Sequence, residues 1–558
     1  MISNVARAAV ARAAPGRGPR AAHSIPVRRR AIEDPDRNLR YHSGMLIEDA
    51  DAAGRAYAAE TPRAHQKAFG QYLTPPPIAG YMARRAELPL QSQSTVRILD
   101  PAAGSGTLAI AACEALANLA APPKTVQLVA YELDRELAQV LRSVLRKAKR
   151  RLAPRIQLNW TVVEKDFVLQ NASVLTEDLF EEERGGFDLV IANPPYFKVA
   201  KSDPRAVACA ALVHGQPNIY AFFMGISARL LRPGGQFCFI TPRSWASGPY
   251  FEHFRREFFR IIRPTAIHLF DSRTASFSRD EVLQEIMITW GIRDDNWLAR
   301  GSPERIEMTT SEGAHDLEDA KRRTLHLDDL LDPRDKHVIL KLPASEADDE
   351  VVELVHSWKG SLAAHGLKIS TGPVVHFRAL EHLLPEAAPS AVPLLWLSHV
   401  RAMQVRWPLG LAKKCEYIRE SKESAYILVP NMNYVLLRRF SAKEEARRLV
   451  AAPYFAIEGF NTVGLENHLN YIYRPSGTLS EDEAWGLSAL LNSATLDRYF
   501  RCVNGNTQVS ATELRAMPLP ELKVIKNIGR RVRGCTGLEK VDLIVGEFLG
   551  EVPRAAVA

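Results

Sequence analysis

One short segment of the chain combines residue types that could bind an amino group. Residues 193–197 read Asn-Pro-Pro-Tyr-Phe and follow the apolar run 187–192. Proline has no N–H and a fixed φ, so the carbonyl groups of Asn193 and Pro194 are expected to point outward without internal partners. The Asn193 amide oxygen beside such a carbonyl makes a pair of acceptors for an NH₂ group on a ring. Bonding both hydrogens draws that nitrogen toward sp³ geometry and frees its lone pair to attack an electrophilic methyl group.

No general base is required before such a transfer, because the proton becomes acidic only once the nitrogen is quaternised. Catalysis is then a matter of positioning and electrostatics. Tyr196 would offer an aromatic face to a planar substrate. The alternative for this motif is a Pro-Pro turn at a sheet edge. The predicted catalytic group contains Asn193, Pro194, Pro195 and Tyr196.

A glycine turn lies upstream of this motif. Residues 98–107 read Ile-Leu-Asp-Pro-Ala-Ala-Gly-Ser-Gly-Thr, which predicts a strand, a tight turn and the start of a helix. Gly104 and Gly106 would let the backbone approach a ligand closely, and a helix N-terminus offers free N–H groups. Residue 109 is alanine, so the pyrophosphate fingerprint of NAD enzymes fails. The Gly-Lys-Ser/Thr ending of a P-loop is also missing.

Two acidic residues accompany this turn. Asp100 ends the first predicted strand, and Glu132 closes the next one. An acid in the second position can accept both ribose hydroxyls, and an acid beside the first loop favours a cationic ligand over a pyrophosphate. A positively charged nucleoside fits best, and S-adenosylmethionine is that ligand. A structural turn with chance acids is the alternative.

The two motifs, in this order, resemble those of S-adenosylmethionine-dependent amino-methyltransferases. Residues 69–76 (Phe-Gly-Gln-Tyr-Leu-Thr-Pro-Pro) resemble the N-terminal cofactor motif of gamma-class DNA N6-adenine methyltransferases of restriction-modification systems. The resemblance implies that Tyr72, Thr74 and a helix expected over 78–85 close over the methionine end of the cofactor. Thr74 before three prolines is also a sound helix cap.

The resemblance assigns further roles. Asp166 matches the residue that holds the cofactor's adenine amino group, and Phe167 matches the ring on its face. Phe277 matches the aromatic that stacks on a flipped base, with a core residue as the alternative. The full predicted cofactor set is Tyr72, Thr74, Asp100, Ala102, Gly104, Gly106, Glu132, Asp166, Phe167 and Asn193.

The elements that must position these residues alternate along the chain. Apolar runs at 96–100, 126–131, 187–192, 236–241 and 285–290 are separated by helix-length segments. This pattern predicts a parallel sheet covered on both faces, that is, a doubly wound, Rossmann-like α/β catalytic domain over residues 46–300. A polar connector is expected over 301–350.

The second half of the chain has a different pattern. Short β-like runs at 393–397, 426–429, 434–437 and 471–473 precede a helix near 481–501, which predicts a mixed α+β domain over 351–525. A C-terminal tail is expected over 526–558.

Basic and aromatic residues are interleaved in this second domain. Residues 401–450 contain eleven Lys or Arg and five acidic residues, which suits phosphate and base contacts, although a solvated basic face is the alternative. Residues 465–472 and 504–515 resemble the target-recognition region of restriction-modification methyltransferases of the PstI type. Asn, Gln and Arg can read base edges. The predicted DNA contacts are Arg401, Arg406, Lys413, Lys414, Asn504, Asn506 and Gln508.

The overall charge is concentrated at the N-terminus. The chain has 558 residues and a formal net charge of +8, and residues 1–45 hold nine Arg against three acids. This segment predicts a disordered basic tail, because it cannot bury enough apolar surface to offset the cost of ordering; a transit peptide or a nucleic-acid contact is the alternative. The remainder has a globular composition, with no apolar run long enough to span a bilayer. Six scattered cysteines indicate a reducing, cytoplasmic location, with no metal site.

These features lead to one functional hypothesis. The chain is predicted to be a site-specific, adenine-specific DNA methyltransferase that transfers a methyl group from S-adenosylmethionine to N6 of a flipped-out adenine in duplex DNA. A monomer is expected, with a cognate restriction endonuclease as a separately acting partner. The alternatives are a methyltransferase of RNA or of a protein glutamine amide, and a catalytically silent DNA-binding specificity subunit. N4-cytosine methylation stays open.

Overall fold

The computed structural model describes residues 45–71, 73–87, 94–176, 186–270, 285–300, 304–333, 335, 337–441, 445–504 and 508–549. Residues 45–558 group into one compact unit. Apart from residue 45, the predicted basic tail lies outside the described residues. The same holds for three predicted site residues, Tyr72, Phe277 and Asn506.

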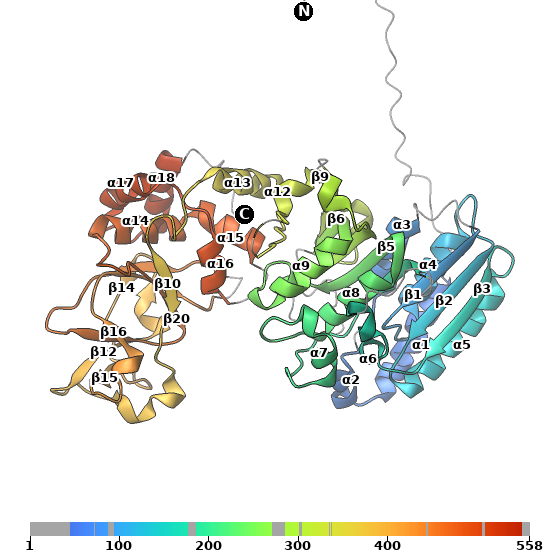
Figure 1. Cartoon of the computed structure of the whole chain (residues 1–558), viewed down its shortest axis with the longest axis horizontal. Helices are drawn as coiled ribbons and strands as arrows, with labels where there is room; N and C mark the ends of the chain where they lie inside the picture. The colour runs from blue at the N-terminus through green and yellow to red at the C-terminus, as the bar shows by residue number, and fades with distance from the viewer. Residues whose placement is uncertain are drawn as a thin grey trace, which may run out of the picture. The chain divides into compact units, whose positions relative to one another are not determined.

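A nine-stranded sheet forms the N-terminal half, in the order β3-β2-β1-β4-β5-β7-β6-β8-β9 (Figure 1). Neighbouring strands from β3 to β5 are parallel, whereas β7 runs antiparallel to both β5 and β6. The expected all-parallel sheet is therefore wrong at this edge, because an apolar run predicts a strand but not its direction. The strands are β1 (Thr95–Asp100), β2 (Thr125–Tyr131), β3 (Gln157–Val163), β4 (Phe187–Ala192), β5 (Leu231–Pro242), β6 (Ile262–Phe270), β7 (Ile286–Arg293), β8 (Arg305–Ser311) and β9 (Lys321–His326).

Helices cover both faces of this sheet. Ile98 and Ile191 pack in one apolar cluster with α3, α4 and α5, while Leu99 and Val190 pack in another with α8 and α9. Successive strand residues point to opposite faces, so both faces are buried and the predicted doubly wound α/β domain is confirmed. The helices are α1 (Met45–Glu60), α2 (Arg63–Phe69), α3 (Pro76–Glu87), α4 (Thr107–Ala117), α5 (Arg135–Leu152), α6 (Phe167–Asn171), α7 (Pro204–Ala208), α8 (Ile219–Leu230), α9 (Glu252–Ile261), α11 (Trp297–Arg300) and α12 (Leu327–Leu330).

The sheet continues into the segment expected to be a connector. Strand β8 pairs with β6, and β9 pairs with β8, so residues 305–326 belong to the catalytic domain and its predicted end at residue 300 is wrong. Ile306 and Met308 are buried and alternate with polar residues, which is a strand pattern. Strand β9 is a largely exposed edge strand with a polar sequence. Because it has no apolar run, the sequence did not predict it as a strand.

The C-terminal half contains two further sheets and a group of helices. One sheet has the order β10-β20-β17-β18 and the other β11-β15-β12-β19-β16, beside a two-stranded pair, β13-β14. This arrangement matches the expected mixed domain. Its strands are β10 (Lys368–Thr371), β11 (Leu383–Leu384), β12 (Ala391–Leu395), β13 (Val400–Arg401), β14 (Gln404–Val405), β15 (Tyr417–Arg419), β16 (Leu428–Pro430), β17 (Tyr434–Arg438), β18 (Ala451–Tyr454), β19 (Thr462–Leu465) and β20 (Leu469–Tyr473). Its helices are α13 (Glu346–Ser357), α14 (Glu481–Asn492), α15 (Ala494–Val503), α16 (Ala511–Ala516), α17 (Leu522–Val532) and α18 (Leu538–Leu549).

Helices α17 and α18 occupy the segment expected to be a tail. Ile525, Ile528 and Val532 are buried, as are residues of α18. Their three- to four-residue spacing forms one apolar helix face, so the chain is folded through residue 549 and the predicted tail is wrong over 526–549. A Cβ at Gly529 would lie 1.9 Å from the Asp482 carbonyl oxygen, so glycine is required where α17 crosses α14.

Two global expectations concern membranes and cysteines. Among the described helices, none is long and apolar enough to cross a membrane. All six cysteines lie within the described residues and are free thiols.

Candidate active site

A pocket opens at the carboxyl ends of β1, β2 and β4. The strand order reverses between β1 and β4, and open α/β sheets bind ligands at such a switch point. Seven predicted site residues line the pocket: Ala102, Gly104, Glu132, Asp166, Phe167, Asn193 and Pro195. Residues that sequence reasoning had not assigned also line it, among them Phe69, Gln71, Lys165, Phe197 and Arg205.

The glycine turn brings backbone N–H groups to the pocket wall. Gly104 and Gly106 have φ values of 54° and 92°, a region that favours glycine. The Gly104 N–H donates to Glu132 Oε2 at 2.9 Å. A Cβ at Gly106 would lie 2.7 Å from Leu141 Cδ1 of α5, so the turn also needs glycine for close packing.

Two carboxyl groups give the pocket its electrostatic character. Asp100 is fully buried, and its Oδ2 has no hydrogen-bond partner among the described residues. Burial, reinforced by the nearby Glu132, raises the pKa of Asp100 to about 7. Burial also raises the pKa of Glu132 to about 7. The Glu132 carboxylate accepts N–H bonds from Gly104 and Asp134, each at 2.9 Å, and these bonds orient it beside the pocket.

The predicted adenine contacts lie at the start of α6. Asp166 Oδ1 caps this helix by accepting from the Leu169 N–H at 3.0 Å. Its other oxygen lies 3.8 Å from Arg205 Nη1. Phe167 is buried and packs edge-on against Tyr131, with ring centroids 5.1 Å apart. Both residues line the pocket, with Phe167 also serving the core.

The Asn-Pro-Pro-Tyr motif follows β4, as expected. Asn193 is 9% exposed, and its Nδ2 donates to Thr74 Oγ1 at 3.1 Å. This bond determines which way the amide points. The Tyr196 hydroxyl lies 2.5 Å from Asn193 Oδ1 and 2.9 Å from the Ile240 carbonyl oxygen, either of which can accept its proton. Thr74 therefore orients the motif, a role that sequence reasoning did not assign.

The segment before Thr74 abuts the same motif. Gly70 has a φ of 62°, and a Cβ there would lie 2.7 Å from Pro195 Cβ. Phe69, Gly70 and Gln71 line the same pocket as Glu132. Phe69, Gly70 and Gln71 could have been predicted as pocket residues from the sequence, because all three belong to the N-terminal motif at 69–76. Arg205 carried no sequence signal.

The predicted nucleic-acid contacts of the second half fall into two groups. Arg401, Arg406, Lys413 and Lys414 are all exposed. Arg406 Nε donates to Gln404 Oε1 at 2.9 Å, and Lys414 Nζ lies 4.6 Å from the centroid of the Trp396 ring. These four residues are placed where phosphates could reach them.

The buried carboxylate of Glu416 holds the loop that carries Arg406, Lys413 and Lys414. Glu416 accepts hydrogen bonds from the N–H groups of Leu409 at 2.6 Å and Leu411 at 2.9 Å. His399 Nε2 lies 2.6 Å from Glu416 Oε1. Burial opposes ionisation, but these hydrogen bonds outweigh it and lower the pKa of Glu416. The loop is thereby held by charge-assisted bonds.

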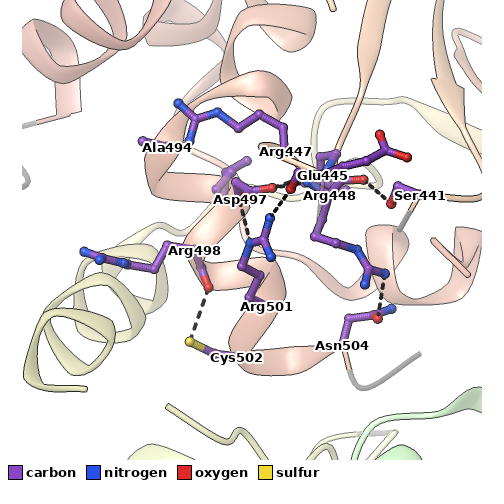
Figure 2. A network of polar contacts seen from close by, with 12 residues as sticks. Ser441, Glu445, Arg447, Arg448, Ala494, Asp497, Arg498, Arg501, Cys502 and Asn504 are labelled. Atoms are coloured by element: carbon purple, nitrogen blue, oxygen red, sulfur yellow. Dashed lines mark hydrogen bonds and ion pairs between the residues drawn. The ribbon is translucent and has the colours of Figure 1, made fainter. Parts of the chain in front are cut away.

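The second group contains a correction. Asn504 is 2% exposed, and Figure 2 shows its side chain meeting Arg448. Arg448 Nη2 donates to Asn504 Oδ1 at 3.3 Å, and Asn504 Nδ2 donates to Glu513 Oε2 at 2.6 Å. Both ends of the amide are used inside the protein, so the predicted base contact is wrong for Asn504. Gln508 is half-buried, and its predicted role is untested.

Arg448 is the centre of that buried network. Its side chain is fully buried, and its backbone N–H donates to Asp497 (Figure 2). Arg501 Nε donates to the other oxygen of Asp497 at 2.8 Å. Several basic residues of this region therefore hold the fold together instead of facing solvent.

Comparisons with known proteins identify the family of the chain. Residues 126–276 match the model of the Eco57I restriction-modification methylase family. The type II methyltransferase M.PstI of Providencia stuartii is 32% identical over 90% of this chain and 97% of its own length. The type II methyltransferase M.BsuBI of Bacillus subtilis is 31% identical over 83% of this chain and 90% of its own length.

Solved structures of restriction enzymes are also similar. The type IIG restriction endonuclease BpuSI is 15% identical, with a TM-score of 0.41 over 90% of this chain and 68% of its own. DrdV in complex with DNA is 14% identical, with a TM-score of 0.46 over 87% of this chain and 59% of its own. The sequence identity over nearly the whole chain decides the assignment: the chain belongs to the restriction-modification methylase family that includes the type II methyltransferases M.PstI and M.BsuBI.

Proposed function

We propose that the chain is a DNA methyltransferase that transfers a methyl group from S-adenosylmethionine to N6 of an adenine flipped out of duplex DNA. The observation that carries this proposal is the Asn193 amide. Thr74 orients it, and it lines the same pocket as Glu132 and Gly104. Membership of the restriction-modification methylase family supports DNA as the substrate.

The pocket fits S-adenosylmethionine. The buried, unpartnered Asp100 Oδ2 is an acceptor that lacks a donor, and Glu132 lies beside it with room on each oxygen for another bond. Two carboxyl groups whose ionised forms are destabilised by burial favour a ligand that brings positive charge and hydroxyl donors. Glu132 would hold the ribose, and Asp166 and Phe167 would hold the adenine ring.

Asn193 and its neighbours perform the chemistry. Asn193 Oδ1 and the Pro194 carbonyl accept the two hydrogens of the substrate amino group and localise its lone pair. When bound, S-adenosylmethionine supplies the methyl group, which the amino nitrogen takes as the carbon–sulfur bond breaks. The nitrogen loses its proton to water only after it carries the methyl group, so this chain needs no base before transfer.

The substrate base must leave the helix to reach Asn193. Flipping costs a few kcal/mol of unstacking, which stacking in the active site offsets. Tyr196 follows Asn193 after two prolines and is half-buried, and its ring is proposed to stack on the base. Phe277 is proposed as the opposite ring. The exposed Arg401, Arg406, Lys413 and Lys414 are proposed to contact the DNA backbone.

Modified-base sequencing tests the proposal directly. The gene is expressed in a host that lacks DNA methylation, and the host genome is then sequenced by a method that detects N6-methyladenine and N4-methylcytosine. N6-methyladenine at one short motif is the expected result. N4-methylcytosine there would replace the proposed target atom. Unmodified DNA from a host containing folded protein that binds S-adenosylmethionine would overturn the proposal and direct attention to RNA or a protein amide.

A further inference from the structure

One wall of the cofactor pocket is formed by a short segment with exposed and half-buried side chains. This cover segment, residues 63–71, contains α2 and leads to Thr74, and Phe69, Gly70 and Gln71 line the pocket. None of its described side chains is buried. The flanking helices differ, because Leu46 of α1 and Met82 of α3 belong to the main apolar core. Polar contacts must therefore hold the cover segment in place.

Two of those contacts, from His65 and Gln71, converge on one carboxylate oxygen of Asp134. Gln66 Nε2 separately donates to the carbonyl oxygens of Ala58 at 2.7 Å and Thr61 at 2.8 Å. Asp134 Oδ2 accepts from the Tyr57 hydroxyl at 2.6 Å and from Gln71 Nε2 at 3.0 Å, and it lies 2.7 Å from His65 Nε2. The three donors come from α1, from α2 and from the end of the cover segment. Asp134 itself is buried, at 5% exposure.

The second oxygen of Asp134 has a separate task. Oδ1 caps α5 by accepting from the N–H groups of Glu136 at 2.9 Å and Leu137 at 3.2 Å. A helix cap alone would need only this oxygen. Burial opposes ionisation of Asp134, but the bonds from Tyr57 and His65 outweigh it and lower its pKa to about 2, so the carboxylate is charged at neutral pH.

The contacts of Asp134 connect the two walls of the pocket. Its backbone N–H donates to Glu132 Oε1 at 2.9 Å, on the wall proposed to hold the ribose. In the cover segment, His65 stacks on Phe69, with ring centroids 4.6 Å apart, and Gln71 lines the pocket itself. A displacement of the cover segment would therefore move pocket-lining residues away from Glu132.

We propose that Asp134 is a positioning residue that closes the cover segment over the cofactor, through the Tyr57, His65 and Gln71 bonds to its Oδ2. This inference rests on the proposed function, because it takes S-adenosylmethionine as the ligand. Asp134 does not touch the reacting atoms. Its loss lowers cofactor affinity and leaves the chemical step at saturating cofactor nearly unchanged.

The substitution Asp134→Asn separates the two oxygens. Asparagine caps helices as well as aspartate does, so its Oδ1 keeps the α5 bonds. The NH₂ group of the asparagine then replaces the accepting Oδ2 atom and faces the three donors. Because two donors cannot bond each other, the contacts to the cover segment break. Hydrogen exchange should become faster at the amides of residues 64–71 and stay unchanged in α5 from Ala138 onward. Calorimetry with S-adenosylmethionine should show a Kd raised about tenfold or more, since charge-assisted bonds are lost.

Two further variants keep the test decisive if Asp134→Asn does not fold. Tyr57→Phe and His65→Phe, made singly and together, remove donors while leaving Asp134 and its cap intact. Each variant should raise the Kd for S-adenosylmethionine, as Asp134→Asn does. The increase should be larger when both donors are removed. Tyr250→Phe is the matched control, because it deletes the hydroxyl of an exposed tyrosine and should change neither readout.

The kinetic signature distinguishes positioning from general destabilisation. KM for S-adenosylmethionine should rise, while kcat at saturating cofactor stays within about twofold and the exchange of α5 amides stays slow. Unchanged exchange in residues 64–71 together with unchanged cofactor Kd would overturn the inference. If the wild-type protein does not bind S-adenosylmethionine, the proposed function fails instead, and the exchange measurement alone still decides whether Asp134 holds the cover segment.

Discussion

The cofactor pocket and the basic surface of the C-terminal half use polar residues in opposite ways. In the pocket, predicted residues at the ends of buried strands meet at one site, as Glu132 and Asn193 do. In the C-terminal half, the predicted basic and amide residues fall into an exposed group and a buried group. Lys413 is exposed, whereas Arg448 and Asn504 are buried and bonded to each other.

This difference shows when a motif can be interpreted residue by residue. A strand end at a topological switch point has few possible positions, so an acid or amide placed there faces the ligand site. A basic or amide residue in a loop-rich domain can either face a phosphate or hold two segments together. Only the tertiary partners distinguish those two roles.

The largest expected effect concerns the pocket. Asn193→Ala removes the acceptor proposed to localise the amino lone pair, so methyl transfer should fall by about 10³-fold or more. The Kd for S-adenosylmethionine should change only a few-fold, because Glu132 and the glycine turn are untouched. Single-turnover transfer and calorimetry measure the two quantities. A near wild-type rate would contradict the assigned mechanism.

Arg448→Ala tests the buried side of the comparison. Removing a buried guanidinium deletes its bond to Asn504 Oδ1 and takes a positive charge away from the buried Glu513, and the free energy of unfolding should fall by about 3 kcal/mol. Denaturant titration provides the measurement. If the unfolding free energy is unchanged while DNA binding weakens, Arg448 would belong with the DNA contacts, and the separation by burial would be wrong.

Thr74→Val tests how the pocket orients its amide. Valine cannot accept the Asn193 Nδ2 bond, so the amide loses one of the bonds that fix its direction and kcat should fall about tenfold. Thr74→Ser keeps the hydroxyl and should restore most of the rate, which a simple packing defect would not allow. Steady-state kinetics at saturating cofactor distinguishes the two outcomes.

The pH dependence of cofactor binding tests the electrostatics of the pocket. Burial raises the pKa of Glu132 to about 7, and ribose hydroxyls and a cationic centre favour its ionised form. Binding should therefore release a proton below about pH 7. Affinity should fall about fivefold from pH 7 to pH 6 and level off above pH 8. Calorimetry across this range measures it, and Glu132→Gln, although weaker, should flatten the dependence. A flat wild-type profile would contradict the assignment.

The smallest expected effect lies on the exposed side. Lys413→Ala should leave the melting temperature unchanged, because surface substitutions of this kind are nearly neutral. DNA affinity should fall a few-fold, and the slope of log K against log salt should become shallower by about 0.9. Filter binding of duplex DNA at several salt concentrations measures the slope. An unchanged slope would remove Lys413 from the contact surface.

The sequence by itself determined the doubly wound domain and seven of the residues that line the pocket. Apolar runs bounded by glycine and proline predict strands, and Asp100, Glu132 and Asn193 each follow or end such a run. The position of a side chain at the end of a strand is determined by the neighbouring residues of the sequence. For that reason their convergence could be predicted from strand order alone.

Only the tertiary structure decided which polar residues hold the molecule together. The Thr74–Asn193 bond joins residues 119 positions apart, and the Tyr57–Asp134 bond joins residues 77 positions apart. The same is true of the direction of β7 and of helix α17, whose glycine fits against α14. Such contacts depend on which surfaces pack together after folding. Whether a polar group is buried is therefore decided by this packing and not by the local sequence.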